Sequence, residues 1–206
     1  MAPGPLPEGA ADPAALVARH GPRLIALARA SIRHGLDHGQ PLAVDLAAYP
    51  ASLRAPAPSF VTLRLDGELR VCIGKTRGQG PLVADVAENA FAAAFRDPRF
   101  DPLDEAEFAR VEIAVSVLGA PQPIAAETDG ALHAALRPGI DGLILKHEAG
   151  QALFLPAVWE MLPDARDFVA HLKAKAGLDP RDWPPDLRAF RFVAATATED
   201  QDRRSD

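Results

Sequence analysis

The amino-acid sequence predicts an α+β fold in which a mixed, mainly antiparallel sheet is flanked by helices, with a smaller second subdomain. Residues 60–73 and 143–155 each alternate apolar and polar side chains on both sides of a turn, which is typical of hairpins. Other segments carry apolar residues at helical spacing. Strands that arrive as hairpins favour an antiparallel sheet with packed helices over a doubly wound parallel sheet.

Composition and charge limit the class of protein. The chain has 206 residues, 48% of them hydrophobic and 24% charged, which is enough for one domain with its own core. No apolar run approaches the length that crosses a membrane, and residues 1–13 lack the features of an export signal. We therefore expect a soluble, cytoplasmic protein. The net charge of −6 argues against nucleic acid as a partner.

Both ends of the chain have compositions typical of disordered tails. Residues 1–13 are rich in Pro, Gly and Ala, and residues 196–206 are polar and charged. The sequence therefore predicts a single domain over residues 14–195, with room for two subdomains. Within it, residues 14–33 have helical spacing with an expected break at Gly21-Pro22, and residues 40–58 contain four prolines and read as an extended connector.

The hairpin over residues 60–73 turns at Asp66-Gly67, and its register can be argued. A two-residue loop would mix apolar and charged side chains on both faces, whereas a three-residue loop pairs Arg64 with Glu68 and gives one apolar face. The second register predicts a core face of Val61, Leu63, Leu69, Val71 and Ile73. It places on the opposite face Thr62, Arg64, Glu68, Arg70 and Cys72, so that Cys72 lies beside Arg70.

The remaining elements follow from local patterns. A helix begins near Pro81 and stops before Pro98, with a buried stripe made of Leu82, Val86, Ala90 and Ala93. Residues 111–118 alternate as a half-buried strand, and the hairpin over residues 143–155 turns near Gly150. A helix over residues 168–176 ends at Gly177, a favourable left-handed cap, and residues 187–194 return as a strand.

Cys72 is the only cysteine, so it forms neither an internal disulfide nor a multi-cysteine zinc site. One interpretation is an inert, well-packed thiol, since an unpaired cysteine is among the most buried residue types. The other is a reactive thiol whose thiolate Arg70 stabilises. A thiol nucleophile would also need a general base, and none of the six histidines is paired with Cys72 in the sequence.

The loop after Cys72 offers a candidate anion site. Gly74-Lys75-Thr76 resembles the end of a P-loop, but Leu69 stands where that motif needs glycine, which excludes P-loop nucleotide hydrolysis. Lys75 and Arg77 precede a helix start whose N–H groups could hold an anion, and the alternative is a solvated mobile loop. Further candidates for a polar cleft, or for solvated and capping positions, are Glu88, Asn89 and Glu112.

The spacing of His34 and His38 would place both rings on one face of a continuous helix. Gly35 lies between them, and no glutamate of an HExxH motif accompanies them. The sequence therefore predicts no metal site, and it leaves the identity of any cofactor open.

The chain resembles the AMMECR-one domain family, also called AmmeMemoRadiSam system protein A. The resemblance spans roughly residues 14–193 and rests on residues 60–63, 67–74, 85–89, 97–100, 112–118, 142–145, 153–159 and 175–178. The family signature Leu-Arg-Gly-Cys-Ile-Gly matches at Leu69, Arg70, Cys72, Ile73 and Gly74. Val71 stands where the signature has glycine, and its larger side chain would narrow any space that the glycine leaves for a ligand. Ala157 stands where the family usually has glutamine.

The resemblance implies two unequal subdomains, a site around Cys72, and a pathway shared with a Memo-like protein and a radical-SAM protein, which would supply the metal and radical chemistry. Two hypotheses follow. In the first, an enzyme or enzyme subunit uses Cys72 as nucleophile or acid, Arg70 to stabilise a thiolate or a small anionic substrate, and Lys75 and Arg77 to hold that anion. In the second, the same surface is a non-catalytic module that binds an acidic ligand or the Memo-like partner.

Overall fold

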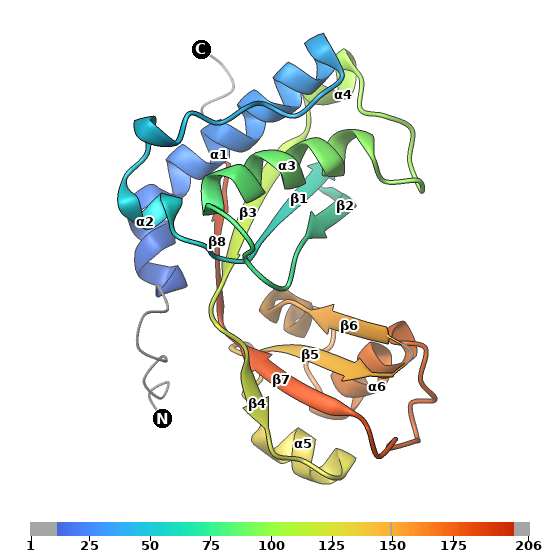
Figure 1. Ribbon diagram of the computed structural model, residues 1–206. Helices are drawn as coiled ribbons and strands as arrows, with labels where there is room; N and C mark the ends of the chain where they lie inside the picture. The colour runs from blue at the N-terminus through green and yellow to red at the C-terminus, as the bar shows by residue number, and fades with distance from the viewer. Residues whose placement is uncertain (1–11, 149, 200–206) are drawn as a thin grey trace. The chain divides into compact units, whose positions relative to one another are not determined.

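The computed structural model describes residues 12–148 and 150–199, and the chain divides into two compact units (Figure 1). The larger unit runs to Leu118 and resumes at Ala195, and the smaller unit holds Gly119–Ala194. Each unit has its own four-stranded sheet and its own hydrophobic core. The prediction of an α+β fold with a smaller second subdomain is therefore confirmed, with the strands divided between two sheets.

The larger unit is a sheet of order β2-β1-β3-β8 covered on one face by two packed helices. Buried side chains of β1 and β3 such as Val61 and Val115 join Leu24 and Val86 of these helices in one core. Its elements are α1 (Pro13–His38), η1 (Leu46–Ala48), α2 (Ala51–Arg54), β1 (Ser59–Leu65), β2 (Glu68–Gly74), α3 (Leu82–Phe95), α4 (Glu105–Phe108), β3 (Glu112–Leu118) and β8 (Ala194–Thr198). The expected helix after Pro81 and the strand over residues 111–118 are confirmed.

Helix α1 is continuous, so the expected break at Gly21-Pro22 is wrong. Pro22 removes one backbone donor, but the helix buries an apolar face along its length, and this packing outweighs the local penalty. Gly21 has its own packing reason, because an added Cβ would lie 2.9 Å from the side chain of Ala197. The helix extends to His38 and ends at Gly39, whose φ is 69°.

The first hairpin has a different register from the one expected. Asp66 and Gly67 have φ values of 52° and 84° and form a two-residue turn that pairs Leu65 with Glu68. The ladder then shifts at a bulge, so that Leu63 lies opposite Val71 and Thr62 opposite Cys72. The three-residue loop is therefore wrong, as is the buried position of Leu69, which is 56% exposed. The core positions of Val61, Leu63, Val71 and Ile73 are confirmed.

Two further expectations are corrected in the larger unit. The segment over residues 40–58 contains η1 and α2, so it is not a uniformly extended connector. Residues 196–198 belong to β8, and Glu199 forms hydrogen bonds of 2.5 and 2.6 Å with the guanidinium of Arg29. The expected disordered tail over residues 196–206 is therefore wrong for its first residues. They form part of β8, which pairs with β3, and such a long-range contact cannot be predicted from composition. Residues 1–11 and 200–206 lie outside the described residues.

The smaller unit has a sheet of order β4-β7-β5-β6, and its registered strand pairs are antiparallel. Its elements are β4 (Gln122–Ile124), α5 (Asp129–Ala135), β5 (Gly142–His147), β6 (Gly150–Phe154), η2 (Pro156–Glu160), α6 (Ala165–Lys175) and β7 (Arg188–Phe192). The second hairpin, the helix and its left-handed cap at Gly177 are confirmed. Elements β4 and α5 are too short to leave a periodic pattern.

An ion pair between a fully buried lysine and a partly exposed aspartate links the helices of the smaller unit. Lys173 of α6 is fully buried, and its Nζ lies 2.5 Å from a carboxylate oxygen of Asp129 in α5. The ammonium also donates to the carbonyl of Asp182 at 2.7 Å and lies 5.1 Å from the ring centre of Trp183. Trp159 stacks on Phe168 at 3.8 Å in the same core. Among the described residues, no helix has the length and apolar character that crossing a membrane requires.

Candidate functional site

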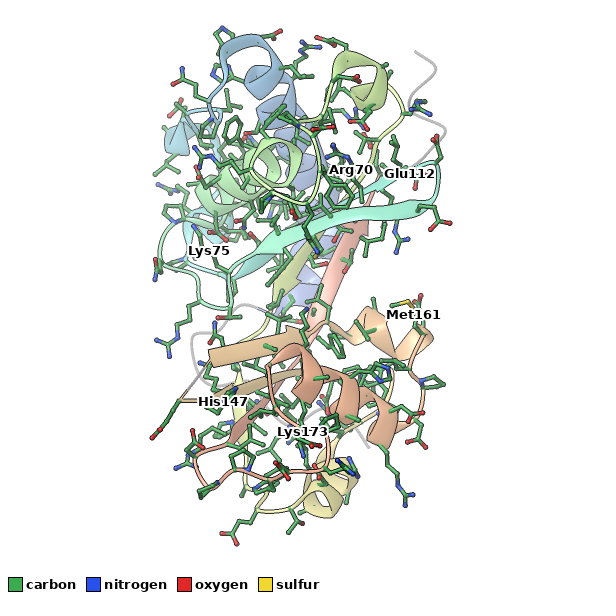
Figure 2. The ribbon with its side chains drawn as sticks, turned by 90° about the vertical axis from the view of Figure 1, so that its right-hand side faces the viewer. Arg70, Lys75, Glu112, His147, Met161 and Lys173 are labelled. Atoms are coloured by element: carbon green, nitrogen blue, oxygen red, sulfur yellow. The ribbon has the colours of Figure 1, made fainter. Side chains whose placement is uncertain are left out.

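The signature residues lie on β2, an edge strand of the larger sheet. Figure 2 shows Arg70 and Lys75 toward opposite ends of this strand, with Glu112 near the Arg70 end. The side chains of the signature therefore enter different surroundings, which we describe as the Arg70 cluster, the Lys75 cluster and the Cys72–Thr62 pair.

The Arg70 cluster consists of Arg70, Phe100, Asp101 and Glu107. The guanidinium donates to the carbonyl of Asp101 at 2.6 Å and to the carboxylate of Glu107 at 3.2 Å. It also lies over the ring of Phe100, 5.4 Å from the ring centre, and its side chain is only 8% exposed. Arg70 thus fastens the segment between α3 and β3 to the edge of the sheet.

Asp97 belongs to the same segment and is held in its charged form. Its carboxylate accepts from the side chain of Arg99 at 2.7 and 2.9 Å and from the backbone N–H of Arg99 at 3.0 Å. These hydrogen bonds, with added attraction from Arg99 and Arg70, lower the pKa of Asp97 to about 2.

This pKa predicts an acid-dependent loss of stability. Because the folded-state pKa is below the ordinary value, the contribution is fully present above about pH 4 and is lost as pH falls toward about 2. We expect Asp97→Asn to remove this part of the pH dependence, as measured by urea unfolding across that range. Asp101→Asn, on the same segment, is the matched control. An acid limb equally steep in the wild type and the Asp97 variant would contradict the assignment.

The Lys75 cluster consists of Ser59, Lys75, Asp85 and Asn89. The Asp85 carboxylate lies 3.3 Å from Nζ of Lys75 and accepts from the hydroxyl of Ser59 at 2.8 Å. The side-chain amide of Asn89 donates to Asp85 at 3.1 Å and also contacts the hydroxyl and carbonyl of Ser59. Ser59, Asp85 and Asn89 are buried, whereas the side chain of Lys75 is 49% exposed. A buried polar network therefore fixes one partly exposed ammonium.

Gly74 and the loop that follows it pack against the start of β1 and the segment before it. A Cβ on Gly74 would lie 2.2 Å from the carbonyl oxygen of Ser59, and one on Gly78 would lie 2.6 Å from the backbone of Ala57. The N–H of Lys75 donates to the Ser59 carbonyl at 3.2 Å. Asp85 in the first turn of α3 already supplies a negative charge at this helix start. The loop is thus packed, and the positive partial charge at the start of α3 already faces the carboxylate of Asp85.

Cys72 lies on the sheet face opposite α1 and α3. It is half-buried, and the hydroxyl of Thr62 on the paired strand lies 3.2 Å from its sulfur. The hydroxyls of Ser116 and Thr196, from β3 and β8, form another hydrogen bond of 2.8 Å. The sulfur of Cys72 is thus in contact with Thr62, whereas the guanidinium of Arg70 bonds Asp101 and Glu107, and the bulge interrupts the regular alternation between the two residues.

The valine that replaces the signature glycine has a structural role in this chain. The side chain of Val71 is 1% exposed and packs in the core of the larger unit together with Leu63. It faces away from the side that carries Cys72 and Thr62. The substitution therefore fills the core and does not narrow the face on which Cys72 lies.

The other sequence candidates are dispersed. Glu88 pairs with Arg96 at 2.9 Å on the outside of α3. Glu112 lies opposite Arg64 at the start of β3, four ladder positions away from Ser116. Arg77 is exposed in the glycine loop. The structure brings Gly74, Lys75 and Asn89 together, and it adds Ser59 and Asp85, which sequence reasoning did not select. An acidic residue in the first turn of α3 was the available signal for Asp85.

A separate hollow lies in the smaller unit. It has a volume of about 700 Å³ and is lined by parts of β4, α5, β7 and their connections, including Ile124, Ala131 and Phe190. None of the residues selected from the sequence lines it.

The α+β fold agrees with the comparisons with known proteins. The model of the AMMECR1 family matches residues 25–197, so the chain belongs to the AMMECR1 family. A protein of Methanothermobacter thermautotrophicus is 36% identical over 184 residues, which cover 87% of this chain and 94% of that protein. Protein MK0488 of Methanopyrus kandleri is 33% identical, with coverage of 90% and 91%.

A solved structure has the same fold. The crystal structure of the uncharacterized protein PH0010 from Pyrococcus horikoshii matches with a TM-score of 0.80 and 31% identity. The match covers 86% of this chain and 90% of that chain. Both units therefore belong to the shared fold.

Proposed function

We propose that this protein is a non-catalytic binding module that docks a protein partner at the edge of β2. The observation that carries the proposal is that Arg70 and Lys75, two of the three cations in residues 69–77, each face a carboxylate. Arg70 contacts Glu107, and Lys75 contacts Asp85. A cation that already faces a carboxylate has less attraction left for a thiolate or an anionic substrate.

The surroundings of Arg70 also support a structural role for it. Its side chain is 8% exposed and bonds a backbone carbonyl as well as a carboxylate. Arginine in such a setting fixes a surface, whereas an anion-binding arginine presents its donors to solvent. This setting of Arg70 favours the binding-module hypothesis, because the Cys72/Arg70 enzyme hypothesis needs the guanidinium to stabilise a thiolate or an anionic substrate.

The edge of β2 has the features of a docking surface. Leu69 is 56% exposed on the strand, and Phe100, which lies against Arg70, is 41% exposed. Exposed apolar side chains next to a rigid, hydrogen-bonded support are typical of protein-binding surfaces. An edge strand also has backbone groups that face away from its one partner strand. The bulge at Arg70 limits continuous pairing and leaves side-chain contacts as the main source of affinity.

The family resemblance supports a choice of partner. The resemblance implies a pathway shared with a Memo-like protein and a radical-SAM protein, so we propose proteins of these two kinds as the partners. In this reading the metal and radical chemistry belongs to the partners, and this chain positions or delivers one of them.

The proposal predicts a defined loss of binding. We expect the purified chain to bind one of the two partners in titration calorimetry, and Leu69→Arg to weaken that binding at least about tenfold, because it places a charge in an apolar contact. Ile140→Arg is the matched control, since Ile140 is 49% exposed but lies in the smaller unit. Equal losses from the two variants, or no binding to either partner, would refute the proposal.

A further inference from the structure

The hollow of the smaller unit lies where β4 leaves the sheet. Strand β4 runs beside β7 and leads into α5 (Figure 1). Its last registered pair is Ile124 opposite Ala189, and the N–H of Ala126 then turns back to the carbonyl of Ile124 at 3.1 Å. Strand β7 begins one residue earlier, at Arg188, which pairs on its other side with Lys146 of β5. At Arg188 the side of β7 toward the hollow therefore has no strand partner in the part of the chain that the structure describes.

The floor of the hollow is apolar. Leu187 and Ala189 are buried there, and Ile124 and Phe190 are half-buried. The ammonium of Lys146 lies 5.1 Å from the ring centre of Phe190, a contact that helps to hold the ring in place. A volume of about 700 Å³ is in the range of pockets that bind small molecules. The hollow can therefore cover the apolar body of such a ligand.

Two opposite charges lie on the rim of the hollow and do not neutralise each other. Glu127 and Arg188 both line it and are exposed, and neither forms an ion pair with any residue that the structure describes. Asp129, the next carboxylate along the chain, lies 2.5 Å from Nζ of Lys173 and is already compensated. The hollow thus presents one carboxylate and one guanidinium at separate points.

The guanidinium of Arg188 is partly fixed. Its Nη1 donates to the carbonyls of Pro185 at 3.3 Å and Leu187 at 3.4 Å. These contacts leave Nε and Nη2, whose parallel N–H bonds suit the two oxygens of a carboxylate. On the other part of the rim, the hydroxyl of Thr128 accepts from the N–H of Ala131 at 3.2 Å and keeps its own proton to donate.

We propose that this hollow binds a zwitterionic ligand of the amino-acid or short-peptide class. The ammonium of the ligand faces Glu127, its carboxylate faces Arg188, and an apolar side chain lies over Ile124 and Phe190. Glu127 would repel an anion without an ammonium, and Arg188 would repel a cation without a carboxylate, so a ligand with both charges fits best. A peptide would also bring backbone groups to the open edge of β7.

The test is NMR titration of the full, ¹⁵N-labelled chain with L-leucine and with L-leucyl-L-leucine. We expect saturable shifts of amides around the hollow, and the tighter of the two probes tells whether the site takes a free amino acid or a peptide. The N-acetylated and the C-amidated form of each probe lack one charge. We expect each of them to bind at least about tenfold more weakly, because one charged hydrogen bond is lost.

Variants assign each charge to its partner. Glu127→Gln should weaken binding of the zwitterion and bind the N-acetylated form equally well, and Arg188→Gln should do the same for the amidated form. Ala131→Trp should abolish binding, because it fills the hollow. Ala134→Trp is the matched control, since Ala134 is exposed on the same helix and does not line the hollow.

Three results would overturn the site: no saturable shift with either probe, wild-type affinity in Ala131→Trp, or equal affinity of the wild type for blocked and unblocked probes. None of them depends on whether β2 docks a partner, because the hollow lies entirely in the smaller unit.

Discussion

Replacing Asp129 by asparagine is expected to lower the free energy of unfolding of the smaller unit by about 3–5 kcal/mol. The substitution removes the carboxylate that lies 2.5 Å from Nζ of the fully buried Lys173. The two carbonyl contacts of the ammonium remain, but they do not replace an opposite charge in a region of low dielectric. Tryptophan fluorescence during urea unfolding measures the effect directly, because Trp159 and Trp183 both lie in this unit.

A second variant separates the ion pair from the packing around it. Lys173→Met keeps a long apolar stem in the core and removes the buried charge, so adding it to Asp129→Asn should restore most of the lost stability. An Asp129→Asn protein as stable as the wild type would show that the pair does not support the fold.

Val71→Gly is expected to destabilise the larger unit by about 3 kcal/mol. The substitution restores the glycine of the family signature, but here it deletes a side chain that is 1% exposed and packed in the core. It also adds the backbone flexibility of glycine to a strand. Hydrogen exchange of amides in β1 and β3 measures the loss, since both strands share this core.

Leu69→Gly provides the matched control for the backbone effect. Leu69 lies on the same strand and is 56% exposed, so its replacement should cost only about 1 kcal/mol. If the two glycine variants are equally stable, Val71 has no core role, and the signature glycine could be restored without cost.

Much of the fold could be predicted from local patterns, and the errors have physical causes. Alternation located both hairpins, and helical spacing located α3 and α6. The break at Pro22 was wrong because the buried face of α1 outweighs one missing hydrogen bond. The hairpin register was wrong because a bulge cannot be read from alternation, and it moved Leu69 out of the core. Strand β8 was missed because its stability comes from pairing with a distant strand.

The site shows the same division between local and long-range information. Gly74, Lys75 and Asn89 were selected from the sequence and lie together, because the loop and the helix that carry them are consecutive. Ser59 precedes them on another strand, and its partnership with Asp85 is a tertiary contact. The expectation that Arg70 lies beside Cys72 assumed regular alternation, whereas the partners of Arg70 come from the segment between α3 and β3.

The pH dependence of Cys72 alkylation tests most directly the claim that Arg70 has a structural role and does not activate the Cys72 thiol. Iodoacetamide reacts with the thiolate, so its rate between about pH 6 and about pH 9.5 reports any stabilisation of that form. The rates would be compared in the wild type, Arg70→Gln and Glu107→Gln, each checked for folding by circular dichroism. We expect superimposable profiles, because the Arg70 guanidinium is held by Glu107. Acid-side reactivity that disappears in Arg70→Gln and increases in Glu107→Gln would contradict the account and restore the Cys72/Arg70 enzyme hypothesis.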